Sequence, residues 1–573
     1  VDHVVALEAN PVGTGVGINL TDYDVVAGTG QTQAQRKLNM AGWKTACQAA
    51  VDDGVTLYLP QGTLELEVDA TADLFSPQSG GTSKAGFVML ADDTLAISGE
   101  SREASILKLF PTTTAFSWSL IFADTFTAGG TFNLYLSKMH VRGPTATGAY
   151  TMRLFGHEGP DSTSAANAGR VVLSEVKTTG AFIDCLSHTG DLTTCDIYNC
   201  DLSAYSTIAT WSCASSSSSL FRATGSRFRD VTKALSDGVI LGPNVAAIVS
   251  DCTFSNITRI ALDLSGTAKT GVPKHNVVDG CSFDSTTLNA IRANKNSGTQ
   301  VIGCSFANLT SSAITIPLHA IVDSCNFNSE FGGGGFASTS RSIIVSNCVF
   351  NRLSLASTHN QVKVGHASSP ANAHFSVTGC KFVSSVAPAG TWVSVIGNGG
   401  DLVVNDCSFI DSAGPANVFG VNPLAGTARI KGSYFEGYIT SIDTYNSTAT
   451  DVDISDCSFV GTGCVSLRGS PNNTSWLRGG NNYWNTNYSP FVLAGNSQPV
   501  GNMTIIQRTN PTVKASATSI VVSQTYNTTR VSGSTKITKI HIQSADVADG
   551  QYMFSGPLYL IASTGASWSI STG

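Results

Sequence analysis

The sequence is poor in charged residues: Asp, Glu, Lys and Arg make up 13% of its 573 residues, about half the usual quarter. The net charge is -7 and there is no long basic run, which argues against nucleic-acid binding. No apolar run reaches the roughly 18 residues that span a bilayer, so we expect no membrane insertion. The first residues, VDHVVALEANPVGTG, lack an initiator Met and the basic and apolar regions of a signal peptide. We therefore expect a preceding segment, with any targeting information, to be missing.

The 14 cysteines do not have the spacing of metal ligands, because no CxxC pair occurs. Nine of them instead occupy the same point of a repeated segment, which a disulfide framework would not produce. We expect these thiols to be reduced and to stack inside a core as small apolar side chains. The nine are Cys200, Cys252, Cys281, Cys304, Cys325, Cys348, Cys380, Cys407 and Cys457.

An aromatic residue lies two positions after this cysteine position, and successive copies are 21 to 32 residues apart. The residue before the cysteine is Asp, Asn, Gly or Ser, types that tolerate left-handed conformations and form tight bends. An apolar residue three positions before the cysteine completes the alternation typical of a short strand. The repeated aromatics are Phe228, Phe254, Phe283, Phe306, Phe327, Phe350, Phe382, Phe409, Phe435 and Phe459.

Each copy therefore predicts a short strand, a bend, and a second strand with inward Cys and Phe. A third strand follows a variable loop, as in RIALDL (259–264) and WVSVI (392–396). We predict an all-β fold, a right-handed parallel β-helix with three short strands per coil, in which coils about 4.8 Å apart form inward ladders. A β-sandwich or propeller is the alternative, but neither would place Cys-x-Phe in every repeat.

The ends of such a stack need covers that prevent pairing with other chains. Residues 32–54 predict an amphipathic capping helix, with Thr32 as N-cap and Gly54 at its end. We predict an N-terminal linker (1–31), the capping helix and first coils (32–109), the β-helix (110–497) and a C-terminal β-sandwich-like domain (498–573). The last of these would cap the stack, bind sugar or trimerise.

The helix leading into VTLYLPQGTL and coils such as IVSDCTFSN, QVIGCSFAN and IIVSNCVFN resemble bacteriophage tailspike depolymerases of the pectate-lyase-like β-helix type, over roughly residues 30–495. The resemblance implies a homotrimer in the virion tail, made in the cytoplasm of the bacterial host. It implies that the protein binds and internally cleaves a bacterial surface polysaccharide, O antigen or capsule, by hydrolysis or β-elimination. It also implies other tail or baseplate proteins as partners through the missing N-terminal region.

Two other functions stay open: a non-catalytic receptor-binding fibre or adhesin, and a free secreted polysaccharide lyase. We expect no cofactor and no metal, because no cluster of Asp residues suggests a calcium site. Apolar residues four positions before the cysteine should point outward and form a stripe that a trimer would bury, unless long loops cover it. These residues are Ile248, Val277, Ile321, Ile344 and Val403.

A first candidate site comes from counting nine residues on from the aromatic, which gives Asp237, Asp263 and Arg292 in successive coils. Two carboxylates one rung apart would be about 5 Å from each other, as in a retaining glycosidase, and like charges would raise one pKa. Arg292 would then hold a substrate carboxylate or an oxyanion. The alternative is a surface ladder in which Arg292 only neutralises the acids.

A second candidate set lies in the longest insertion and the loop before it. A β-eliminating lyase needs a base and a cation that stabilises the enolate. Clustered histidines that are merely solvated are the alternative. The catalytic candidates are Glu330, His359 and Lys363, and the substrate-binding candidates are Arg341, His366 and His374.

Overall fold

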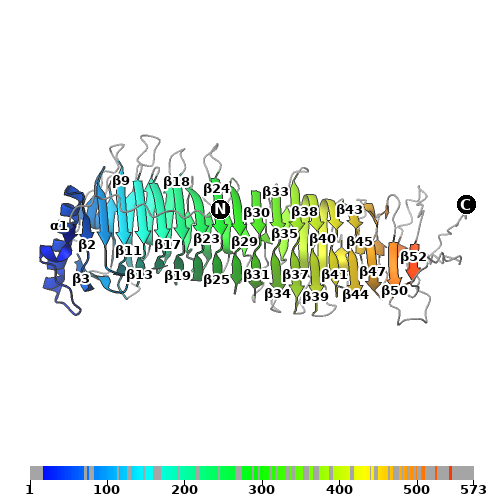
Figure 1. Cartoon of the computed structure of the whole chain (residues 1–573), viewed down its shortest axis with the longest axis horizontal. Coiled ribbons are helices and arrows are strands. Elements are labelled where there is room, and N and C mark those ends of the chain that lie inside the picture. The colour runs from blue at the N-terminus through cyan, green and yellow to red at the C-terminus, as the bar shows by residue number, and fades with distance from the viewer. Residues whose placement is uncertain are drawn as a thin grey trace, which may run out of the picture. The chain divides into compact units, whose positions relative to one another are not determined.

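In a computed structural model, the chain divides into two compact units, Val1–Gly298 and Thr299–Gly573. Both consist of parallel strands stacked coil upon coil (Figure 1). The residues that the structure describes are 17–69, 74–75, 83–112, 115–124, 131–145, 149–158, 169–182, 184–190, 193–213, 219–242, 245–264, 274–286, 289–293, 297–309, 313–315, 319–329, 336–337, 342–352, 361–365, 373–385, 392–412, 418–438, 440–443, 450–461, 465–468, 476–480, 482–486, 491–494, 498–499, 505–509, 523–525 and 541–544.

Each coil of the first unit passes through three sheets, named I, II and III in chain order. Sheet I contains β2 (Thr56–Tyr58), β6 (Thr94–Ser98), β9 (Phe132–Ser137), β12 (Gly169–Ser174), β15 (Thr193–Tyr198), β18 (Ser219–Thr224), β21 (Val245–Ser250) and β24 (Lys274–Asp279). Sheet II contains β3 (Gly62–Val68), β7 (Ser105–Pro111), β10 (His140–Arg142), β13 (Lys177–Thr179), β16 (Asp201–Ser203), β19 (Arg227–Val231), β22 (Thr253–Ile257) and β25 (Ser282–Thr286). Sheet III contains β5 (Ser83–Met89), β8 (Ala115–Ala123), β11 (Ala149–Glu158), β14 (Asp184–Gly190), β17 (Thr207–Cys213), β20 (Val239–Leu241), β23 (Ile260–Leu264) and β26 (Asn289–Ala293).

The second unit repeats this arrangement, and its long strands β38 (Trp392–Asn405) and β40 (Val418–Lys431) belong to both sheet III and sheet I. The other strands of sheet I are β27 (Ser297–Ile302), β30 (His319–Asp323), β33 (Ser342–Ser346), β36 (His374–Thr378), β43 (Thr450–Ser455), β46 (Trp476–Gly480) and β49 (Gln498–Pro499). Sheet II contains β28 (Ser305–Ala307), β31 (Asn326–Ser329), β34 (Val349–Arg352), β37 (Lys381–Ser384), β39 (Ser408–Asp411), β41 (Tyr434–Glu436), β44 (Ser458–Gly461), β47 (Asn482–Thr486), β50 (Ile505–Thr509) and β52 (His541–Ser544). The others of sheet III are β29 (Ile314–Thr315), β32 (Phe336–Ala337), β35 (Val362–Gly365), β42 (Thr440–Asp443), β45 (Val465–Arg468), β48 (Phe491–Ala494) and β51 (Ser523–Thr525).

A helix covers the N-terminal end of the first unit, as predicted (Figure 1). The helix α1 (Gln33–Asp52) begins after Thr32, whose hydroxyl accepts a hydrogen bond from the backbone N–H of Gln35, and Gly54 after its end has a φ of 61°. Before it lie β1 (Ile18–Asn19), which pairs with β2, and a short 3-10 helix, η1 (Leu20–Tyr23). A two-residue strand, β4 (Leu74–Phe75), pairs antiparallel with β5. The predicted capping helix is confirmed.

The bends between sheets I and II confirm the role predicted for the residue before the cysteine. All nine such residues have a φ between 51° and 64°, including Asp251 and Asp406. The 12 cysteines whose side chains the structure describes are free and buried. Their thiols are more than apolar filling, because the Cys252 Sγ donates to the Ser250 carbonyl at 3.2 Å, and the Ser226 hydroxyl makes the equivalent bond at 3.0 Å. The repeated Cys therefore also satisfies a carbonyl group at each bend.

The aromatic ladder forms the dry centre of both units. Neighbouring rings are 4.8–4.9 Å apart in the first unit, from Phe228 to Phe283. In the second unit they are 4.5–5.0 Å apart, from Phe306 to Phe459. Each ring therefore stacks on the equivalent ring of the next coil, and the coils repeat at the strand spacing.

The positions predicted to point outward do so, since Ile248, Ile321 and Ile344 are about 40% exposed. The homotrimer expected to cover them stays a prediction. The domain boundaries predicted from the sequence also stay predictions. In the region predicted as a C-terminal domain, β50 and β52 pair in parallel with the preceding strands of sheet II.

Candidate functional site

The carboxylate of Asp237, first of the predicted pair, is buried in the turn before β20. The Nε of Arg259 donates to its Oδ1 at 2.6 Å, and the same guanidinium contacts its Oδ2. The backbone N–H of Ile260 donates to Oδ1 at 3.1 Å. An arginine from the next coil therefore holds this carboxylate.

Asp263 and Arg292 lie opposite each other on β23 and β26, as predicted, and form an ion pair in which the Arg292 Nε donates to the Asp263 Oδ1 at 3.2 Å. The residue opposite Asp263 on β20 is Ile240 and not Asp237. The predicted column is thus wrong at Asp237. The two carboxylates do not lie on directly paired residues of neighbouring strands. Each has its own arginine, as in the ion-pair alternative, and the catalytic roles of the three residues stay predictions.

Only two members of the second predicted set lie among the described residues. Lys363 is exposed on β35 of sheet III, whereas His374 is exposed on β36 of sheet I, so they lie on different sheets. The His374 Nδ1 lies 3.4 Å from the Asp401 Oδ2. The members outside the described residues are Glu330, Arg341, His359 and His366.

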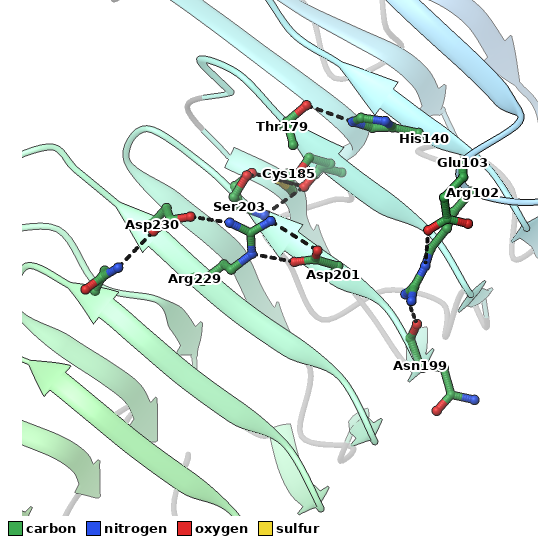
Figure 2. A network of polar contacts seen from close by, with 12 residues as sticks. Arg102, Glu103, His140, Thr179, Cys185, Asn199, Asp201, Ser203, Arg229 and Asp230 are labelled. Atoms are coloured by element: carbon green, nitrogen blue, oxygen red, sulfur yellow. Dashed lines mark hydrogen bonds and ion pairs between the residues drawn. The ribbon is translucent and has the colours of Figure 1, made fainter. Parts of the chain in front are cut away.

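Sequence analysis missed a charged site on sheet II of the first unit (Figure 2). Asp201 on β16 and Arg229 on β19 form a two-point ion pair, Nε to Oδ1 at 2.6 Å and Nη2 to Oδ2 at 3.1 Å. The Nη1 of Arg229 also donates to Asp230 at 2.5 Å. Burial by itself raises the pKa of Asp201, but Arg229, with Lys177 and Arg227, lowers it below its usual value. Asp201 is therefore a carboxylate at neutral pH.

Two further cations, Lys177 and Arg227, flank this carboxylate and a third, Arg142, lies farther along the sheet; we call these three residues the basic face. Lys177 and Arg227 occupy the rungs directly before and after Asp201, and Arg142 lies on β10, one coil before Lys177. Arg142 and Arg227 are exposed and Lys177 is half-buried. Among the described residues none of the three forms an ion pair within 4.0 Å. The basic face is therefore available to an external anion.

His140 borders the basic face on β10, one rung from Lys177. The Nε of Arg142 donates to its Nδ1 at 3.4 Å, so its proton is on Nε2, which lies 2.7 Å from the Thr179 hydroxyl (Figure 2). Burial, followed by the charges of Arg142 and Lys177, lowers the pKa of His140 to about 4. The imidazole is therefore neutral at neutral pH and adds no charge to the face.

The strands below this face are tied together by hydrogen bonds. The Thr178 hydroxyl donates to the Ser203 carbonyl at 3.0 Å, and the Ser203 hydroxyl donates to the Thr178 carbonyl at 2.8 Å. The Cys185 thiol also donates to the Ser203 carbonyl, at 3.1 Å (Figure 2). These reciprocal bonds between β13 and β16 fix the spacing of the charged side chains above them.

The coil that contains Asp201 also carries a second carboxylate between cations, on sheet I. Asp196 on β15 is fully buried, and its oxygens accept from the Nε of Arg170 at 3.1 Å and of Arg222 at 2.6 Å. Both arginines are about one third exposed. One carboxylate thus orients two guanidinium groups, and the net charge of the trio is positive.

The chemistry open to this region follows from its charges. Lys177 and Arg227 lie two coils apart, about 10 Å by the strand spacing, on either side of Asp201, and this spacing fits acidic groups of an extended polymer. Guanidinium groups bind carboxylates and phosphates strongly. Among the described residues, no group of three or more His, Cys, Asp or Glu side chains is placed to hold a metal ion. In that part of the chain no helix is long and apolar enough to span a membrane.

Comparison with known proteins supports the fold. Residues 237–409 match the family described as the right-handed β-helix region, which agrees with the handedness expected of parallel crossovers. The chain adopts a right-handed parallel β-helix. No curated protein matches the sequence.

Several solved structures share this fold at low identity. The A-module of the mannuronan C-5 epimerase AlgE6 from Azotobacter vinelandii is 11% identical, with 77% of this chain and 99% of that chain covered and a TM-score of 0.39. The N-terminal fragment of gene product 12 from bacteriophage Phi29 is 10% identical, with 86% of this chain and 87% of that chain covered and a TM-score of 0.46. The tailspike gp49 from Pseudomonas phage LKA1 is 13% identical, with 85% of this chain and 82% of that chain covered and a TM-score of 0.30. These similarities, at 10–13% identity, indicate nothing beyond the fold.

Proposed function

We propose that the protein is a phage tailspike that binds and internally cleaves an acidic bacterial surface polysaccharide, O antigen or capsule, for host attachment. The observation that carries this proposal is the basic face, in which cations without an ion-pair partner among the described residues flank the Asp201 carboxylate. An acidic chain lying across the coils would place successive acidic groups near Arg142, Lys177 and Arg227.

The same residues favour β-elimination over hydrolysis. Elimination from a uronate needs a cation that stabilises charge on the carboxylate as the proton on the neighbouring carbon is removed. Lys177 and Arg227 would supply the positive charge, and the Asp201 carboxylate between them would accept the proton. Arg229 would position Asp201. The lowered pKa of Asp201 keeps it ionised at neutral pH and also makes it a weaker base.

The test is incubation with purified acidic polysaccharides from a panel of bacteria and with neutral polysaccharides as the matched control. Gel electrophoresis follows chain length, and ultraviolet absorbance follows the unsaturated uronate that elimination creates. We expect shortening of an acidic polymer together with new absorbance. Shortening without absorbance would indicate hydrolysis, and shortening of neutral polymers only would contradict the role of the basic face.

A non-catalytic receptor-binding fibre is the second candidate, and one observation favours it. Asp237 and Asp263, like Asp201, are each paired with an arginine, which is typical of a structural ion pair. The two functions are distinguished by turnover: a fibre would bind an acidic polysaccharide and leave its length unchanged.

We also propose that the protein is a homotrimer, with attachment to other tail proteins through a preceding segment. Support comes from the outward isoleucines of sheet I, Ile321 and Ile344 in the second unit, because exposed apolar stripes usually meet a partner. Light scattering at micromolar concentration should give three times the mass of one chain. A monomer would contradict the proposal.

A further inference from the structure

A column of polar side chains runs along sheet I of the second unit, separate from the basic face. The register pairs His319 with Ser342, Ser342 with His374, and His374 with Asp401 on successive strands. Thr427 follows on β40, opposite Asp401. Parallel pairing thus stacks a histidine, a serine, a histidine and an aspartate at one residue per coil.

All of these side chains lie on the outer face of the sheet. The next residue on each of the first four strands is buried, because successive side chains of a strand point to opposite faces. The imidazoles of His319 and His374 are exposed, and Ser342 and Asp401 are half-buried. The column is therefore open to a ligand. The buried neighbours are Ala320, Ile343, Phe375 and Leu402.

Asp401 is held so that it can orient His374. The Thr427 hydroxyl donates to the Asp401 Oδ1 at 2.5 Å, which leaves Oδ2 facing the His374 Nδ1 at 3.4 Å. Arg429 is farther away, with its Nη2 3.9 Å from Oδ2. A carboxylate beside Nδ1 keeps the proton of a neutral imidazole there and leaves Nε2 as the base. Contacts of this kind are often long before substrate binds.

We propose that this column is a second active site, which hydrolyses acyl esters on sugar hydroxyls. The Ser342 Oγ attacks the ester carbonyl carbon and forms an Oγ–C bond, while His374 Nε2 takes the hydroxyl proton. His319, on the rung before Ser342, donates a hydrogen bond to the oxyanion. The ester C–O bond then breaks, and the sugar hydroxyl leaves with the proton from His374. Water repeats the sequence on the acyl-serine, which releases a carboxylic acid and restores Ser342.

The roles follow from position along the column. Ser342, His374 and His319 would touch the reacting atoms and are catalytic, whereas Asp401 and Thr427 are positioning residues. The outward column of Ile321 and Ile344 lies two residues farther along the same strands. A trimer contact made there would border the Ser342 column.

The experiment uses the full chain, a fluorophosphonate probe that labels activated serines, and O-acetylated xylan as ester substrate. We expect labelling at Ser342 by peptide mapping, and acetate release that Ser342→Ala abolishes. His374→Ala should slow both about 100-fold or more, and His319→Ala should slow acetate release to a similar extent. Ser346→Ala, an outward serine on the same strand, is the matched control and should be unchanged.

Asp401→Asn should slow labelling at least tenfold, and Asp401→Glu should restore part of the rate, which a merely structural role would not do. Gel filtration and thermal unfolding confirm that each variant is folded. Equal labelling or equal acetate release in Ser342→Ala and wild type would overturn the proposal, and so would absence of both reactions in wild type. Shortening of acidic polysaccharides should be unchanged in Ser342→Ala, which separates this site from the basic face.

Discussion

From β19 onward, sheet II has the same inward phenylalanines in both units, but its outer face differs between them. In the first unit its outward positions carry charged residues such as Arg142, Lys177, Asp201, Arg227 and Arg229. In the second unit the equivalent positions are mainly uncharged, including Asn326, Asn328, Val349, Asn351, Val383, Ser408, Ile410, Ser458 and Val460, with Lys381 and Glu436 as exceptions.

This contrast separates the residues that build the fold from those that give it chemistry. From β19 onward, the inward Cys, Phe and bend residues are under the same packing constraint in each coil, so they repeat in both units. The coils of β10, β13 and β16 carry Val141, Thr178 and Leu202 in place of the phenylalanine. The outward residues contact solvent and can differ from coil to coil at little cost in stability. A cluster of charge at outward positions of neighbouring coils is therefore a signal of function.

The largest expected effect concerns the shared inner face. Phe254→Ala in the first unit and Phe382→Ala in the second each remove a fully buried ring that stacks on two others. Each should lower the free energy of unfolding by about 3–5 kcal/mol, measured from urea unfolding curves. The two effects should be similar, and a difference of more than twofold would show that the inner faces are not equivalent.

The second effect is a dependence of stability on pH that belongs to the first unit. His157 is buried there, with its Nδ1 2.8 Å from the His188 Nδ1, and burial lowers its pKa to about 4. Because the unfolded pKa is near 6.5, the unfolded chain binds the proton first as pH falls. The buried neutral His157 therefore contributes about 3 kcal/mol to the free energy of unfolding above pH 6.5, and this contribution is lost as the pH falls toward 4.

Hydrogen exchange at pH 7 and pH 5 measures this effect for each unit. Protection around His157 and His188 should fall at pH 5, whereas the aromatic ladder of the second unit should keep its protection, since no histidine is buried among its described residues. His157→Phe keeps a ring at this position and should remove part of the pH dependence, because the lowered pKa of His140 supplies a comparable part. Equal loss of protection in both units would contradict the assignment.

The third effect concerns the basic face. Lys177→Ala combined with Arg227→Ala should weaken binding to an acidic polysaccharide by roughly 10- to 100-fold. Each hydrogen bond to a charged group contributes about 1.5–3 kcal/mol, and the remaining cations should recover part of this loss. Lys381→Ala, the lysine at the equivalent outward position of the second unit, should have no effect. Equal losses in the two variants would mean that the charge contrast has no role in binding.

The smallest effect tests the outer face of the second unit. The Tyr434 hydroxyl donates to Glu436 at 3.1 Å on the surface of β41. Tyr434→Phe removes this exposed bond and should change the free energy of unfolding by less than about 0.5 kcal/mol. Binding to polysaccharide should be unchanged. A loss of binding comparable to that of the basic-face variant would move the ligand site to the second unit.

The residues of the inner face could be predicted from the sequence because they repeat. The residue before each cysteine had to allow a tight bend, and Asp251 and Gly280 have φ values of 53° and 60°. The hydrogen bond from each thiol to a bend carbonyl could not be predicted, because it depends on the direction of the side chain in the folded coil. The substitution of Cys by Ser226 and Ser433 was the available signal, since both are hydrogen-bond donors.

The register of Asp237 could not be predicted because the turns between sheets II and III differ in length. Leu262 and Ile291, which pair with each other, each lie eight residues after the aromatic of their coil. Val239, which pairs with Leu262, lies eleven residues after Phe228. A fixed count from the aromatic therefore succeeds for Asp263 and Arg292 and fails for Asp237.

The basic face was missed because the search started from the aromatic and not from the cysteine. Lys177, Asp201 and Arg227 directly follow the cysteine position in three successive coils, so this alignment was present in the sequence. His140 precedes them in the same column, directly after Met139. Its neutral state depends on burial and on two neighbouring cations, which only the folded coils bring together.

The most direct test of the central claim is to measure the affinity of the protein for an acidic bacterial polysaccharide that it binds, and for the same polymer after reduction of its carboxyl groups. If the basic face is the substrate site, reduction should weaken binding to wild type at least tenfold and should make little difference to the Lys177→Ala, Arg227→Ala double variant. Equal affinity of wild type for the two polymers would contradict the account.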